Sequence, residues 1–182
     1  MKDENKRRIR SLTLSAMFLA LGIVLPFFTM QLEEIGNMLL PMHLPVMLCG
    51  LICGWKYGGV VGFILPLLRS LLFGRPVMYP NAAAMALELM TYGIVVGLVY
   101  TALGRGRLWQ VYASLISAML AGRAVWGCVY AALLGASGSA FTLSAFLAGA
   151  FLNAIPGIVL QLVLIPAIIA ILKKSEKERN IV

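Results

Sequence analysis

Apolar residues run along this chain in six stretches, separated by short segments that contain charged residues, Gly or Pro. A helix needs about 20 residues, at about 1.5 Å per residue, to cross a hydrocarbon core of roughly 30 Å. The pattern predicts an all-α membrane protein, a bundle of six transmembrane helices. We expect a single integral membrane domain over residues 1–182, with spans at roughly 12–28, 39–54, 57–73, 81–103, 108–134 and 141–172.

Composition supports the membrane class. The 182 residues are 61% hydrophobic and 12% charged, which is too apolar for a soluble domain of this length. Three Cys and one His show no metal-ligand spacing, and the phosphate-binding pattern GxxxxGK[ST] is missing from the sequence. We therefore predict no metal, no cofactor and no ATPase activity of this chain's own.

The basic residues set the predicted topology. The net charge is +8, but most of the Lys and Arg residues lie in short segments that flank the apolar stretches, so they do not indicate a nucleic-acid partner. Both tails are basic, and so are the turns around Lys56 and around Arg105 and Arg107. Six spans place these four segments on one side, which predicts cytoplasmic N- and C-termini.

Six charged residues fall on the opposite, outer side: Arg69, Arg75, Arg123, Glu33, Glu34 and Glu88. Arg123 lies 15 residues after Leu108, or roughly 22 Å into its helix. Charge inside a membrane protein is costly and indicates a functional site. Glu88 is expected to pair with Arg69 or with Arg123, either as a structural ion pair or while one partner faces a ligand.

These residues predict a small-molecule site in a cavity in the outer half of the membrane. Trp126 and Tyr130 share the helix face of Arg123, and either stack on a flat ligand or anchor the helix at the interface. His43 is interpreted as a helix-end hydrogen-bonding residue, with a proton relay as the alternative. Gln161 is interpreted as lining the cavity or bonding between helices. The candidate substrate-binding residues are Glu33, Glu34, Asn37, Arg69, Arg75, Asn81, Glu88, Tyr92, Arg123, Trp126, Tyr130 and Asn153.

Several motifs resemble a known family. They are Ala16 and Ala20, four residues apart in the first span, and the segments 42–50, 58–62 and 66–70. With six spans and a long first outer loop, the whole chain resembles the substrate-binding S component of energy-coupling factor (ECF) transporters. The resemblance implies a multi-pass protein of the cell membrane that captures a water-soluble vitamin. It also implies that Ala16 and Ala20 contact a transmembrane coupling subunit, which two cytoplasmic ATPases drive.

The identity of the nutrient rests on charge. Three outer arginines favour an anionic group such as a carboxylate, so pantothenate is the leading candidate. The balancing glutamates keep vitamin B6 compounds as the main alternative. Two other classes remain open: a membrane assembly or scaffold subunit without a ligand, and an intramembrane enzyme. The enzyme is disfavoured because the sequence has a single His and no paired acidic motif.

The orientation predicts which residues an impermeant thiol reagent reaches. In a background without Cys49, Cys53 and Cys128, a cysteine replacing Lys56 should be labelled only from the cytoplasm, whereas one replacing Glu34 should be labelled from outside. The measurement is labelling of intact cells against inverted vesicles. Labelling at position 56 in intact cells would contradict cytoplasmic termini.

Overall fold

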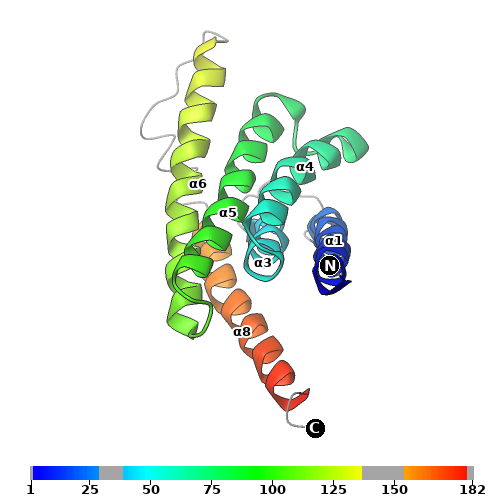
Figure 1. Cartoon of the computed structure of the whole chain (residues 1–182). Coiled ribbons are helices and arrows are strands. Elements are labelled where there is room, and N and C mark those ends of the chain that lie inside the picture. The colour runs from blue at the N-terminus through cyan, green and yellow to red at the C-terminus, as the bar shows by residue number, and fades with distance from the viewer. Residues whose placement is uncertain (1, 29–38, 137–153, 180–182) are drawn as a thin grey trace.

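The computed structural model describes residues 2–28, 39–136 and 154–179, and these residues form helices and short connections without a strand (Figure 1). The elements are α1 (Lys2–Val24), η1 (Leu25–Phe27), α3 (His43–Cys53), α4 (Trp55–Phe73), η2 (Met78–Ala82), α5 (Ala83–Ala102), α6 (Leu108–Ala136) and α8 (Ile155–Arg179).

Five of these helical segments are long and apolar enough to cross a membrane: Glu4–Phe27, Trp55–Phe73, Met78–Ala102, Leu108–Gly135 and Ile155–Ser175. A sixth apolar helix, α3, is shorter. The predicted all-α membrane bundle is therefore confirmed. The start of the predicted last span, residues 141–153, lies outside the described residues.

Helix α3 is shorter than the stretch 39–54 that the sequence predicts. Its 11 residues extend about 16 Å, roughly half of a hydrocarbon core. Pro41 precedes the helix and Pro45 lies in its first turn, where a missing N–H is tolerated. At the other end Gly54, with φ of 98°, turns the chain directly into α4. His43 consequently begins α3 inside the bundle.

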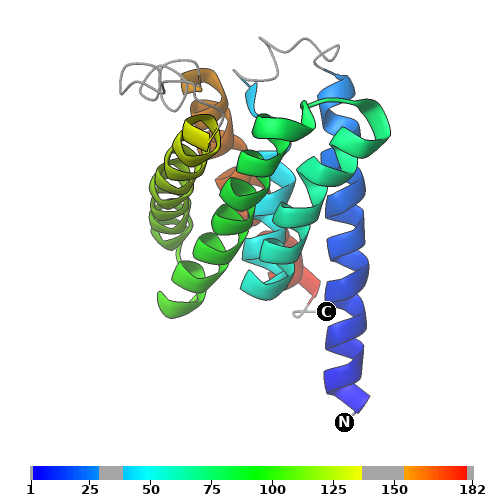
Figure 2. The ribbon, with the colours of Figure 1, turned by 90° about the horizontal axis from the view of Figure 1, so that it is seen from above.

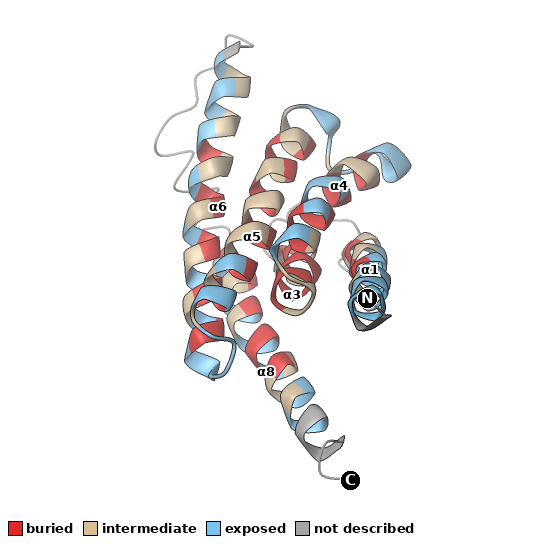
Figure 3. Cartoon of the chain, viewed as in Figure 1, coloured by how far each residue is buried: buried red, intermediate tan, exposed pale blue. Residues whose placement is uncertain are grey.

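Helix α3 lies among the longer helices (Figure 1), in contact with α1, α4, α5 and α8. Most of its residues are buried, whereas α1 and α8 each present an exposed side (Figure 3). Many large apolar residues are exposed on the long helices, as expected for helices that face lipid. Examples are Leu71 of α4, Ile116 of α6 and Val163 of α8.

Close contact between α4 and α5 depends on glycine. A Cβ at Gly93 would lie 2.2 Å from the carbonyl oxygen of Gly58, and one at Gly62 would lie 2.3 Å from that of Leu89. Small residues allow such backbone approach, and dispersion contacts then hold the helices together in lipid. The two helices therefore form a tightly joined pair beside α3.

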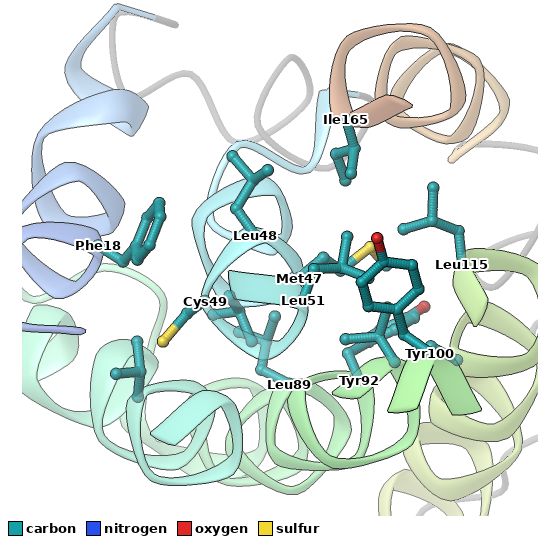
Figure 4. Packing of buried hydrophobic residues seen from close by; sticks show 14 of the residues in the cluster. Phe18, Met47, Leu48, Cys49, Leu51, Leu89, Tyr92, Tyr100, Leu115 and Ile165 are labelled. Atoms are coloured by element: carbon teal, nitrogen blue, oxygen red, sulfur yellow. The ribbon is translucent and has the colours of Figure 1, made fainter. Parts of the chain in front are cut away.

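The buried core collects residues from several helices (Figure 4). Met47 and Leu51 of α3 lie among Leu89 of α5, Leu115 of α6 and Ile165 of α8. This apolar layer fixes the relative heights of the helices. It thereby sets the depth of polar residues that lie one or two turns away on the same helices, before or after the apolar residues in the chain.

The basic segments meet at one end of the bundle. The Lys173 ammonium donates to the carbonyl oxygens of Arg105, at 3.3 Å, and of Gly106, at 3.1 Å. The start of α1 and the end of α8 also lie towards the same end (Figure 2). This agrees with an even number of spans, while the side of the membrane on which that end lies stays a prediction.

Candidate functional site

A polar layer lies next to the apolar core. His43 is one turn before Met47 in α3, and Gln161 is one turn before Ile165 in α8. In α6, Arg123 is two turns beyond Leu115. Glu88 of α5 joins this layer through its contacts with His43 and Arg123. The exposed fractions are 1% for His43, Glu88 and Gln161 and 5% for Arg123.

Glu88 contacts two other members of the polar layer, Arg123 and His43. Its Oε1 lies 2.9 Å from Arg123 Nη1 and 3.5 Å from His43 Nε2. The ring of Tyr92, one turn further along α5, packs edge-on against the His43 ring with centroids 5.1 Å apart. Residues from α3, α5 and α6 thus converge on one carboxylate. The sequence predicted Arg69 or Arg123 as the partner of Glu88, and in the structure the partner is Arg123.

Several polar atoms of this cluster have no hydrogen-bond partner in the described part of the chain. They are both ring nitrogens of His43, Oε1 of Glu88, Nε and Nη2 of Arg123, and Nε2 of Gln161. Buried polar groups are nearly always satisfied, and an unsatisfied one costs about 1–3 kcal/mol. A concentration of them inside an apolar bundle indicates a polar binding site rather than a packing element.

The unpartnered atoms of Arg123 form one edge of its guanidinium. Nε–H and one N–H of Nη2 point in parallel, in the fork that receives the two oxygens of a carboxylate. The neighbouring Nη1 faces Glu88. Arg123 is therefore held by Glu88 at one nitrogen, while no group of the described helices occupies its bidentate edge.

Arg69 has a different position. Its Nη1 donates to the carbonyl oxygen of Ile23 at 2.7 Å, near the end of α1. Its guanidinium lies between the rings of Phe27 and Phe73, 5.3 and 5.7 Å from their centroids, and the residue is 3% exposed. Arg69 joins the C-terminal ends of α1 and α4 and is not a partner of Glu88.

The predicted aromatic residues form a second group near the start of α5 and the C-terminal part of α6. Trp126 and Tyr130 stack with centroids 5.0 Å apart, and the Tyr130 hydroxyl donates to Asn81 Oδ1 at 3.1 Å. Nearby, the Tyr79 hydroxyl donates to the carbonyl oxygen of Leu133 at 2.6 Å. The group ties η2 to α6.

The other predicted site residues divide in two. Arg75 is exposed in the connection between α4 and η2. Glu33, Glu34, Asn37 and Asn153 lie outside the described residues. Two residues of the polar layer, His43 and Gln161, were not among the candidate substrate-binding residues. The only signal for them was a polar side chain within an apolar stretch, which does not distinguish a helix end from a site.

Ala16 and Ala20 lie on the exposed side of α1, together with Met17, Leu21 and Val24. The opposite side of the helix packs on α3 and α4, where Ser15 contacts Cys49 at 3.6 Å. The small-residue face is thus not used for packing within the described bundle.

The chain matches the family described as ECF transporter, substrate-specific component, over residues 10–169. Because the match covers most of the chain, the protein belongs to this family. It is a substrate-binding subunit of an ECF transporter, a multi-pass protein of the cell membrane and not an enzyme, and it works with an ECF module. No curated protein and no solved structure matches it.

The contacts of Arg69 predict a structural effect. Arg69→Ala should lower the free energy of unfolding by about 1–3 kcal/mol, since a charge-assisted hydrogen bond is lost. It should leave ligand affinity nearly unchanged. The measurement is SDS-induced unfolding in mixed micelles, with Arg107→Ala, at an exposed position, as the matched control. A loss of affinity as large as that of Arg123→Ala would show that Arg69 belongs to the binding site.

Proposed function

We propose that this subunit captures a carboxylate-bearing vitamin, pantothenate foremost, and that Arg123 receives the carboxylate. The observation that carries the proposal is the Nε and Nη2 edge of Arg123, which is buried and has no partner among the described residues, while Nη1 faces Glu88. Such an edge is matched by a planar group with two acceptor oxygens. Belonging to a family of substrate-specific components supports the presence of a small-molecule ligand.

Other side chains would contact the remainder of the ligand. Gln161 Nε2 is a further buried donor, suited to a carbonyl or hydroxyl oxygen of the ligand. Asn81, Trp126 and Tyr130 would form the wall towards the outer end. Glu33, Glu34, Asn37 and Asn153 remain proposed contacts from segments that the structure does not describe. In this arrangement Tyr92 supports His43 and does not need to touch the ligand.

Vitamin B6 compounds remain the second candidate. The stacked pair of Trp126 and Tyr130 favours them, because an aromatic face can bind a flat ring. Their neutral forms offer no carboxylate to the free edge of Arg123, however. The two candidates therefore predict different consequences of changing that arginine.

The proposal predicts that Arg123→Ala weakens pantothenate binding by about 2–5 kcal/mol, the loss expected when one partner of a buried charge pair is truncated. Arg123→Lys should also bind weakly, since an ammonium cannot form the bidentate fork. Affinities are measured by calorimetry on folded, detergent-purified variants. Pantothenol, in which an alcohol replaces the carboxylate, is the matched ligand and should respond little to either change. Pantothenate binding that survives Arg123→Ala would contradict the assignment.

We further propose that the exposed side of α1 docks the transmembrane coupling subunit, which two cytoplasmic ATPases drive. The support is the pair Ala16 and Ala20, four residues apart on one face and outside the internal packing. Small side chains allow close approach of a second helix within the bilayer. The family membership supplies the need for such a partner.

Docking through this face predicts that Ala16→Leu or Ala20→Leu blocks uptake, because a larger side chain separates the helices. Ligand binding by the purified subunit should stay intact, since both residues are exposed. The matched control is Ala167→Leu, at an exposed alanine of α8, which should leave uptake unchanged. Uptake of labelled ligand into cells is the measurement. Normal uptake with both α1 variants would show that the partner binds elsewhere.

A further inference from the structure

The cluster around Glu88 is close to neutral before a ligand arrives. Among the described residues, the titratable groups that face His43 are Glu88 and Tyr92 from α5 and Arg123 from α6. In α8 the buried polar side chain is the uncharged Gln161, and in α4 the buried Arg69 bonds to Ile23 instead. An ionised Glu88, a cationic Arg123 and a neutral imidazole sum to zero.

A ligand carboxylate changes this balance. Bound at the free edge of Arg123, it would place a second negative charge on one guanidinium that already faces Glu88. The cluster would then carry one net negative charge at positions that are at most 5% exposed. Uncompensated charge in such surroundings is strongly disfavoured, and a nearby group takes up or releases a proton instead.

His43 is placed to supply the missing positive charge. Its Nε2 lies 3.5 Å from Glu88 Oε1, and neither ring nitrogen has a hydrogen-bond partner in the described structure. Imidazole is the side chain that ordinarily changes charge between pH 5 and 8, and the protonated ring donates from both nitrogens. One donor would face Glu88 and the other would remain for the ligand.

We propose that His43 takes up one proton from water when Arg123 receives the ligand carboxylate, so that nutrient capture is coupled to proton binding. This inference rests on the proposed function, because it requires an anionic ligand at Arg123. The bound state then contains two carboxylates, one guanidinium and one imidazolium and is neutral again. No bond other than N–H forms, and the proton comes from bulk solvent.

The coupling gives the affinity a defined pH dependence. The complex holds one more proton than the free protein, so affinity rises as pH falls wherever free His43 is neutral and the ligand stays ionised. By linkage, the dissociation constant should increase by up to about tenfold for each pH unit by which the pH rises within that range, as long as His43 in the complex stays protonated. A site in which a fixed arginine alone neutralised the ligand would show almost no dependence there.

Proton uptake can be counted directly by calorimetry. Pantothenate is titrated into the purified subunit at pH 7.5 in two buffers of different ionisation enthalpy, phosphate and Tris. The observed enthalpies should differ by an amount that corresponds to about one proton taken up per ligand. Pantothenol, which carries no charge, is the matched control and should show no uptake.

Two variants test whether His43 is the residue that takes up the proton when pantothenate binds. His43→Gln keeps hydrogen-bonding capacity but cannot become cationic, so it should bind pantothenate at least about tenfold more weakly and take up no proton. Glu88→Gln removes the competing negative charge, so it should bind pantothenate without proton uptake. Retained uptake in His43→Gln would overturn the assignment to His43.

The outcomes for the unaltered protein separate the two proposals. Normal pantothenate binding with no proton uptake, or equal uptake with pantothenol, overturns the proton coupling and leaves the role of Arg123 standing. An absence of pantothenate binding overturns both. Uptake of one proton with pantothenate alone supports both.

Discussion

A single buried carboxylate constrains the polar layer of this bundle. Glu88 is 1% exposed, so its charge must be compensated within the protein. Arg123 supplies the compensation from α6, and it reaches Glu88 because α6 approaches α5 closely. At Gly122, next to Arg123, a Cβ would lie 2.9 Å from the Tyr92 ring. A small residue beside the cation therefore makes the ion pair possible.

Depth in the membrane follows from the shortness of α3. A helix of ordinary length would bring its first residues to the interface, where water satisfies a histidine. Helix α3 instead begins at His43 within reach of Glu88, and glycine contacts hold it there. A Cβ at Gly50 would lie 2.6 Å from the carbonyl oxygen of Gly93, so α3 and α5 are in backbone contact. Apolar packing thus places a titratable ring where solvent cannot balance its charge.

The sequence predicts the helices better than it predicts the contacts between them. Apolar length and the basic turns define the bundle, because both follow from the cost of placing polar backbone and charge in lipid. The depth of Arg123 also follows, from counting along one helix. The sequence does not predict that Glu88 pairs with Arg123 rather than with Arg69. That choice depends on the rotation of the helices and on the carbonyl oxygen of Ile23, near the end of α1, which accepts from Arg69. The contact of His43 with Glu88 does not follow from the sequence either, because α3 begins later than its apolar stretch.

Two separate faces result from this architecture. The polar layer is built on α3, α5, α6 and α8, whereas the small-residue face belongs to α1, which contacts the others through its opposite side. Substitutions that change the polar layer therefore need not alter the exposed side of α1. The physical link between the two faces runs through α3, which carries His43 at its start and Cys49, in contact with Ser15 of α1, two turns later. Most of α3 is buried against its neighbours, so the two faces share one tightly packed helix.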